Sequence, residues 1–299
     1  MKKPILLIII LFIHAQSFAQ VLPADSLLLE IIDAPYWTKE LSVGINFNQG
    51  TFSENWRGGG INSVAFGGIV AGTANYLRQR VTFDNEIELL YGVVRNQGQE
   101  QRKMNDRIFL DSKLGYFLSD NWGAFFSANF ISQFAPGYDY DSPERTLISD
   151  FLSPGYLTTG LGFEYKPNQE FNLRISPISP RFTFMRNQRI QENVPDNYGV
   201  PIGQTVRTEW LAFQLYATWN KDIAENFNIK SRYMMYANYE TLEWRRVDHR
   251  FDVTLTAKIT DWINVTLTSI NLYDFDQDPG VQYSQVLAIG LMYKIGNKN

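Results

Sequence analysis

Residues 247–259, with the sequence VDHRFDVTLTAKI, constrain the fold of this chain more than any other stretch. Their odd-numbered positions are almost all apolar, and their even-numbered positions are all polar. Successive side chains of a β-strand point to opposite faces, so a strand here has one apolar face and one charged face. The stretch is about twice the usual strand length of roughly five or six residues, and it is about as long as a tilted strand that crosses a bilayer. We therefore expect a strand of a membrane β-barrel, with lipid on one side and a polar lumen on the other.

Similar strand-like segments follow one another along the chain. We place them at 37–49, 62–77, 80–94, 105–118, 122–135, 155–166, 171–186, 209–220, 226–240, 244–259, 262–274 and 281–295. Short connections such as 260–261 mostly alternate with longer polar ones such as 136–154 and 187–208. Short periplasmic turns, long outer loops and an even strand number are typical of outer-membrane barrels. The sequence thus predicts an all-β protein, a single 12-stranded antiparallel transmembrane β-barrel over residues 37–299 with both ends in the periplasm.

Aromatic residues gather near both predicted ends of the apolar faces. The short-turn end carries Trp37, Tyr116, Trp122, Tyr165, Phe171, Trp219, Phe227, Trp262 and Tyr293, and the long-loop end carries Phe47, Tyr91, Phe134, Tyr239, Tyr273 and Tyr283. Such barrels have aromatic girdles at both membrane interfaces. A soluble β-sandwich, the alternative fold, has no reason to place rings at both ends of its apolar face.

Three places depart from the alternation. Asn85 and Gln285 occupy lipid-facing positions of their strands, and the segment around Pro177 and Pro180 slips in phase. Because proline cannot donate to a sheet ladder, we expect a bulge or an edge-like distortion there.

Residues 1–19 have the pattern of a secretory signal peptide. Two lysines form the positive end, residues 5–13 form the apolar run, and Ser-Phe-Ala at 17–19 forms a cleavage site. The apolar run is too short for a membrane anchor, which is the other reading of this segment. We expect residues 20–36 to be a periplasmic leader or, alternatively, a plug of the lumen. Export together with a barrel predicts the cell outer membrane as the location.

The composition excludes several kinds of chemistry. The chain has no cysteine, which excludes disulfides, thiol catalysis and a lipidated N-terminal cysteine. Its formal net charge of −4 lacks the basic excess of nucleic-acid-binding proteins, so we expect no nucleic-acid partner. The expected surroundings are outer-membrane lipid, and the candidate partners are small solutes or other outer-membrane proteins.

Charged residues are concentrated on the predicted lumen face. They are Asp84, Glu86, Glu88, Arg107, Asp111, Lys113, Lys230, Arg232, Asp248, Arg250, Asp252 and Lys258. A basic residue facing lipid at the bilayer midplane costs about 2–4 kcal/mol, so these side chains should point inward. They would either line a solute-selective pore or form a cross-strand ion-pair lattice that fills a closed barrel. Both signs of charge occur on neighbouring strands, so the sequence leaves the two readings open.

The first outer loop contains a glycine-rich motif, Asn55-Trp56-Arg57-Gly58-Gly59-Gly60, followed by Asn62-Ser63 at the next strand. With this motif the chain resembles a family of Bacteroidota outer-membrane proteins of unknown function, whose first strand is followed by an Asn-Trp-x-x-Gly-Gly loop and then Asn-Ser. The resemblance implies an outer-membrane barrel and supplies no activity. From the residues alone, Trp56 is read as a loop anchor rather than a ligand platform.

The last outer loop carries Asp274, Asp276 and Asp278 in alternate positions. A calcium loop needs glycine at its sixth position and glutamate at its twelfth, where this chain has Pro279 and Gln285. We therefore expect a solvated acidic loop, and we predict neither a metal nor a cofactor.

His249 is the only histidine after residue 19, and it lies in the lipid phase near the outer rim. Ser269 and Asn271 on the next strand would complete the residue types of a lipid hydrolase. The close His-x-Ser pairing on one strand that outer-membrane phospholipases have is missing. A small-solute channel is the first functional hypothesis, a structural or assembly barrel with a closed lumen is the second, and a hydrolase is a distant third. We expect no enzymatic activity.

Overall fold

The computed structural model describes residues 36–53, 55, 57, 60–140, 145–191 and 193–297. The chain divides into Met1–Trp37 and Thr38–Asn299, and the second unit contains the barrel. The predicted signal peptide and nearly all of the predicted leader lie outside the described residues. Within the described ranges, no helix is long and apolar enough to cross a membrane.

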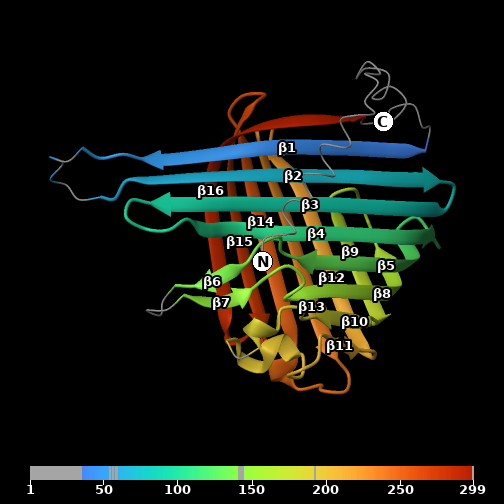
Figure 1. The fold of residues 1–299 in the computed structure, drawn as a ribbon. Coiled ribbons are helices and arrows are strands. Elements are labelled where there is room, and N and C mark those ends of the chain that lie inside the picture. The colour runs from blue at the N-terminus through green and yellow to red at the C-terminus, as the bar shows by residue number, and fades with distance from the viewer. Residues whose placement is uncertain are drawn as a thin grey trace, which may run out of the picture. The chain divides into compact units, whose positions relative to one another are not determined.

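Strands make up most of the described chain (Figure 1). They are β1 (Trp37–Gly50), β2 (Ser63–Arg78), β3 (Val81–Asn96), β4 (Arg102–Phe117), β5 (Trp122–Ser132), β6 (Gly137–Asp139), β7 (Thr146–Ser149), β8 (Gly155–Tyr165), β9 (Phe171–Ile178), β10 (Arg181–Phe184), β11 (Val206–Glu209), β12 (Ala212–Ala224), β13 (Phe227–Asn238), β14 (Asp248–Lys258), β15 (Ile263–Asp274) and β16 (Asp278–Asn297). Short 3₁₀ helices lie in the outer loops: η2 (Gln188–Ile190), η3 (Pro195–Gly199) and η4 (Trp244–Arg246).

The main sheet closes on itself. Its order runs β8-β5-β4-β3-β2-β1-β16-β15-β14-β13-β12-β9, and a further pairing of β8 with β9 completes the ring. β10 continues β9 toward the outer end, and β11 leads from the outer end into β12. We therefore count β9 with β10 as one barrel strand and β11 with β12 as another. The result is a closed 12-strand antiparallel barrel, as the sequence predicted.

The expected irregularity around Pro177 and Pro180 is confirmed. β9 ends at Ile178, β10 begins at Arg181, and the register against β8 shifts between Leu161 and Phe163. The carbonyl of Pro180 still accepts a hydrogen bond from the backbone N–H of Thr159 at 2.9 Å. The barrel wall therefore stays paired across the bend although proline offers no donor.

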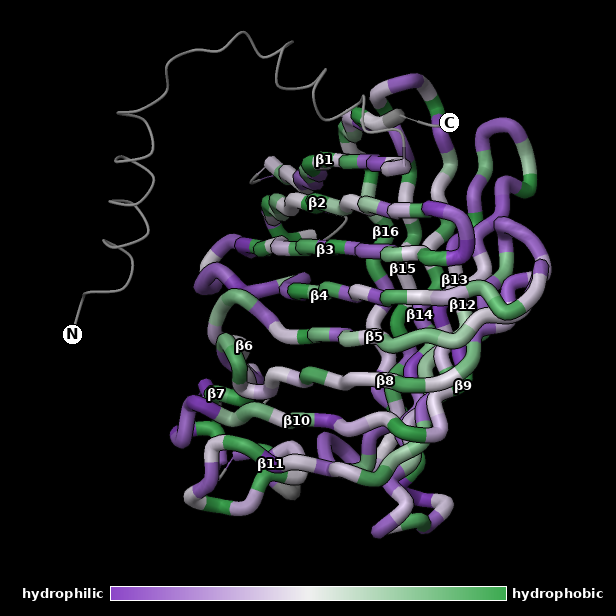
Figure 2. The backbone as a smooth tube through the Cα atoms, turned by 90° about the vertical axis from the view of Figure 1, so that its right-hand side faces the viewer, coloured by the Kyte–Doolittle hydropathy of each residue, from purple (hydrophilic) through white to green (hydrophobic). Residues whose placement is uncertain are grey.

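The alternation of side chains is also confirmed. On β14, Phe251 is 43% exposed on the outer face, whereas its neighbour Asp252 is 7% exposed and faces the lumen. Figure 2 shows hydropathy changing repeatedly along the strands. Asn85, which faces outward, donates to the carbonyl of Ala74 and accepts from the Ser112 hydroxyl, so its amide is hydrogen-bonded at the lipid-facing surface.

The outer loops contain structure that the sequence did not predict. β6 and β7 form a hairpin inside the 136–154 loop, and η2 and η3 lie in the 187–208 loop. Met185, Ile190 and Val200 form a small buried core there. The strand expected at 244–259 begins only at Asp248, because 244–246 form η4.

The closing strand β16 is shared between its neighbours. It pairs with β15 over 282–291 and with β1 over 290–297. Gly290 pairs with both, and a Cβ atom there would lie 2.6 Å from the carbonyl oxygen of Ile45. Glycine thus allows three backbones to meet at this point.

Gly290→Ala should lower the free energy of unfolding of the refolded barrel by about 1–3 kcal/mol, because the added methyl group collides with a backbone carbonyl. Gly68→Ala is the matched control, since the nearest atom to its Cβ would be the Gly44 carbonyl oxygen at 3.8 Å. Urea unfolding in lipid vesicles measures both. Equal losses for the two variants would contradict this account of the closure.

Candidate functional site

The charged residues predicted for the lumen lie on the inward faces of their strands. All of them except Lys258 form ion pairs with other side chains of the barrel interior. Lys258 is half-exposed at the rim and pairs with Asp261 at 2.8 Å in the following turn, where this lysine lowers the pKa of the aspartate. Asp248 belongs to a charged cluster at the outer end, and the remaining predicted residues form the lumen network; both are described below.

Glu86 is the central acceptor of this network. One of its carboxylate oxygens lies 2.5 Å from the Lys230 ammonium and 2.9 Å from the Arg232 guanidinium. Glu86 belongs to β3, and both cations belong to β13. These strands face each other across the barrel: β4, β5, β8, β9 and β12 separate them one way, and β2, β1, β16, β15 and β14 the other. The pairs therefore cross the lumen along its width.

A second bridge crosses the lumen between β4 and β14, which are also opposite each other. Arg107 contacts Glu88 at 3.1 Å and Asp252 at 3.2 Å, and Arg250 reaches the same aspartate at 2.9 Å. Phe109 lies between the bridges and is fully buried. The guanidinium carbons of Arg232 and Arg107 are 4.0 Å and 4.9 Å from its ring centroid. Cation–π contacts of this kind are stronger where water is excluded.

Ion pairs along the wall extend the lattice beyond the two bridges. Lys113 pairs with Asp84 at 3.0 Å and also with Glu164, and Arg174 pairs with Asp111 at 2.7 Å. Lys113 is only 2% exposed. Buried charges are stable only when they are paired and hydrogen-bonded, and each of these has an opposite charge within reach.

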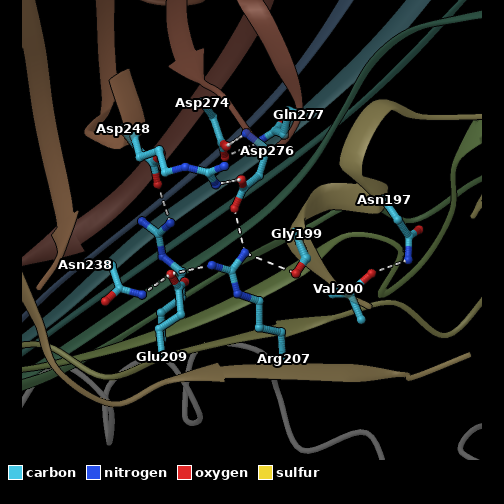
Figure 3. Close-up of polar contacts among 12 residues, drawn as sticks. Asn197, Gly199, Val200, Arg207, Glu209, Asn238, Asp248, Asp274, Asp276 and Gln277 are labelled. Atoms are coloured by element: carbon cyan, nitrogen blue, oxygen red, sulfur yellow. Dashed lines mark hydrogen bonds and ion pairs between the residues drawn. The ribbon is translucent and has the colours of Figure 1, made fainter. Parts of the chain in front are cut away.

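A separate charged cluster closes the outer end (Figure 3). Arg181 donates to Asp248 at 2.5 Å, and its guanidinium carbon lies 3.3 Å from the Tyr236 ring centroid. Arg207 contacts Asp276 at 2.6 Å and Glu209 at 3.1 Å. Because Arg207 also donates to the carbonyl of Gly199, it ties η3 to the barrel mouth.

The prediction of a solvated acidic loop was wrong for Asp274 and Asp276. Asp274 is 6% exposed and accepts from Gln277, while Asp276 pairs with Arg207 and Arg246. The expectation was wrong because the facing arginines come from segments far away in the sequence. Among the described residues, no group of three or more His, Asp or Glu side chains is arranged to hold a metal.

A cavity of about 330 Å³ lies between the central lattice and the outer cluster. Arg107, Asn129, Tyr156, Arg181 and Tyr236 are among the residues that line it. The two tyrosine hydroxyls, the Asn129 amide nitrogen and one terminal nitrogen of Arg107 have no hydrogen-bond partner among the described residues. The lining also includes the carboxylates of Asp106, Asp248 and Asp274, so the cavity has polar walls with both donors and acceptors.

The outer loop that covers this end is held by local contacts. The Tyr198 hydroxyl donates to the carbonyl of Ile148 at 2.8 Å, and burial raises the pKa of this phenol. Asn197 donates to the carbonyl of Val200 at 2.7 Å. The Tyr198 contact joins the 187–208 loop to β7 of the β6–β7 hairpin, and the Asn197 contact lies within the loop.

The glycine-rich loop is only partly described: Trp56, Gly58 and Gly59 lie outside the described residues. Asn55 accepts a hydrogen bond from the Ser53 hydroxyl at 2.6 Å. Gly60 has a φ of +134°, and a Cβ there would overlap the Phe52 ring, so this position requires glycine.

The residues of the hydrolase hypothesis are not brought together. His249 pairs in register with Tyr273, and its Nδ1 lies 2.8 Å from the Tyr233 hydroxyl. Ser269 instead pairs with Val253 and accepts from the Asn271 amide at 3.4 Å.

The sequence analysis missed several members of the lattice. Extending the alternation through the segment 155–166 would have placed Glu164 inward. The phase slip near Pro177 hid Arg174 and Arg181, because they lie on either side of the bend. No sequence signal marked Phe109 as the centre of the lumen.

One family model and several solved structures are similar to this chain, and none of them indicates its role. A family described as "Protein of unknown function (DUF3078)" matches residues 47–138, less than half of the chain. No curated protein matches. Similar solved structures include an outer membrane channel from Pseudomonas putida F1, with 10% identity over 88% of this chain and 96% of that chain and a TM-score of 0.43. The translocator domain of the autotransporter NalP from Neisseria meningitidis has 11% identity over 90% and 92% of the two chains and a TM-score of 0.34. The NanC porin has 9% identity over 86% and 100% and a TM-score of 0.39.

Glu86→Ala should lower the free energy of unfolding by about 3–5 kcal/mol, because it leaves Lys230 and Arg232 without their shared carboxylate. Glu170→Ala is the matched control, since its pair with Lys221 is 43% exposed on both sides, and it should have little effect. Denaturant unfolding followed by tryptophan fluorescence measures both variants. If the two variants lose the same stability, Glu86 does not have the role assigned here.

Proposed function

We propose that this protein is a barrel of the cell outer membrane, exported by a cleaved signal peptide at 1–19 and preceded by a periplasmic leader at 20–36. The exposed apolar side chains of the outer face support a lipid environment, among them Val43, Phe66 and Leu287, which are 45%, 52% and 62% exposed. A closed barrel satisfies its backbone groups without water, as a membrane-spanning sheet must. Ring pairs at the short-turn end, Trp262 with Tyr293 and Trp122 with Tyr165, support the predicted aromatic girdle.

The lumen of this barrel acts as a barrier, and the protein acts as a binding or assembly component of the membrane rather than as an open diffusion channel. The observation that carries this proposal is the bridge from Glu86 to Lys230 and Arg232, whose two ion pairs join opposite walls. A solute that passes through the lumen would have to displace these ion pairs, in which Arg232 is buried and Glu86 partly buried. Removing the partner of a buried charge costs several kcal/mol.

A gated small-solute channel is the second candidate. The cavity of about 330 Å³ above the lattice favours it, because such a chamber would hold a solute before the bridges open. A hydrolase is not proposed, since His249 and Ser269 do not contact each other in the described structure.

Single-channel recording in planar bilayers distinguishes a barrier from a channel. The unmodified protein should show no steady conductance. The triple variant Glu86→Ser with Arg107→Ser and Arg232→Ser should conduct, because it removes long side chains from both bridges that cross the lumen. Glu170→Ser with Lys221→Ser is the control, since it removes an ion pair that does not cross the lumen, and it should stay silent.

Steady conductance by the unmodified protein would contradict the barrier. A correctly folded triple variant that remains silent would contradict the assignment of the barrier to Glu86, Arg107 and Arg232.

A further inference from the structure

The outward face of β15 and β16 changes from apolar to polar partway along the barrel. Toward the inner end its cross-strand pairs are apolar, namely Val265 with Ile289 and Leu267 with Leu287. The next two pairs toward the outer end carry hydroxyl or amide groups, namely Ser269 with Gln285 and Asn271 with Tyr283. Leu287 and Tyr283 are 62% and 61% exposed, so both kinds of pair meet the surroundings of the barrel.

These polar groups are incompletely satisfied by the barrel itself. The Asn271 amide lies 3.4 Å from the Ser269 hydroxyl and 3.5 Å from the Phe251 carbonyl, at the long limit of hydrogen bonding. The Tyr283 hydroxyl donates to the side-chain oxygen of Gln285, whereas the amide nitrogen of the exposed Gln285 donates to no acceptor among the described residues. A polar group without a partner is costly in hydrocarbon. These side chains therefore need polar surroundings outside the barrel.

The height of these residues shows that they interrupt the apolar band. Trp262 and Tyr293 stack at the short-turn end and mark the inner girdle. A strand tilted by about 40° gains about 2.5 Å of height per residue. Ser269 follows Trp262 by seven residues and Gln285 precedes Tyr293 by eight, so both lie about 18–20 Å above this girdle. The apolar band of such barrels is about 25 Å tall, and on β15 and β16 it ends earlier than that.

The wall formed by β2, β3 and β4 keeps its apolar face at the same height. There Tyr116 pairs with Val81 near the short-turn end. Leu89 lies eight residues after Val81, and its neighbours on either side are Val70 and Ile108. The apolar band is therefore taller on this wall than on β15 and β16.

The backbone of β16 is also incompletely paired beside the polar side chains. β16 pairs with β1 over 290–297 only, so residues 282–289 have a described partner on the β15 side alone. Open sheet edges do not occur in hydrocarbon, because nothing there replaces the missing hydrogen bonds. An acyl chain offers neither donors nor acceptors, whereas headgroups and their water offer both. The side chains and the edge thus require the same surroundings at the same height.

We propose that Ser269, Asn271 and Gln285 form a notch in the apolar band, where phospholipid headgroups of the outer leaflet and their water contact the barrel. The headgroups hydrogen-bond the three side chains, and their water satisfies the open edge of β16. The outer leaflet is consequently thinner beside β15 and β16 than beside β2 and β3. This inference rests on the proposed membrane location and does not depend on whether the lumen conducts.

Lipid-specific fluorescence quenching tests the notch. The chain has no native cysteine, so Gln285→Cys and Leu89→Cys each carry a single fluorescent nitrobenzoxadiazole label. The full-length variants are reconstituted in phosphatidylcholine vesicles that contain a lipid with a nitroxide either on its headgroup or on its acyl chain. The label at 285 should be quenched more strongly by the headgroup nitroxide. The label at 89, at the same height on the other wall, should show the reverse order.

The possible failures are distinguishable. If the label at 285 prefers the acyl-chain nitroxide as the label at 89 does, the notch is overturned and the membrane location stands. If neither nitroxide quenches either label, the membrane location fails and the notch fails with it. If the label at 285 alone escapes both nitroxides, protein covers this surface, and a second copy or another partner replaces the proposed headgroups.

A repair variant tests the three side chains themselves. Ser269→Leu with Asn271→Leu, in the Gln285→Cys background, should shift quenching toward the acyl-chain nitroxide, because the outward face becomes apolar to a greater height. Ile263→Leu with Val265→Leu is the matched control, since it leaves the apolar part of β15 apolar, and it should cause no shift. An unchanged order of quenching in a correctly folded repair variant would contradict the assignment of the notch to these side chains.

Discussion

The carboxylate of Glu86 is the point on which the interior of this barrel depends. It lies on β3 and receives two cations from β13 on the opposite wall, so it holds together strands that share no backbone hydrogen bonds. Arg232 then packs on the ring of Phe109, next to the second bridge at Arg107. Removing one charge from such a set leaves its partners without their counter-charge, so we expect the members of the lattice to be energetically coupled.

The lattice occupies only part of the lumen, and this explains the cavities. Strands β3, β4, β13 and β14 send long charged side chains across the barrel. Strands β15, β16, β1 and β2 contribute short inward side chains such as Thr266, Ala288, Gly44 and Gly67. Space therefore remains on the side of β15, β16, β1 and β2, next to the incomplete pairing of β1 with β16. The occluded centre and the cavity beside it are two results of one uneven distribution of side-chain size.

Much of the fold could be predicted because its signals are local. The alternation of apolar and polar residues predicted the strands and their two faces, and the prolines predicted the bend before Arg181. The partners of each charge could not be predicted, because alternation says that Glu86 points inward but not how far the opposite wall lies. The pairing of Asp276 was missed for the same reason, since Arg207 and Arg246 approach it from distant segments of the chain. The double pairing of Gly290 depends on the register of the last strand, which no pattern within one strand specifies.

A double-mutant cycle on Glu86 and Arg232 tests the central claim most directly. The free energies of unfolding of Glu86→Ala, Arg232→Ala and the double variant are compared with that of the unmodified barrel in the same vesicles. The account predicts a coupling energy of about 2 kcal/mol or more, because the two side chains form one buried bridge. Additive effects, with a coupling energy within about 0.5 kcal/mol of zero, would show that the opposite walls are not joined by this pair.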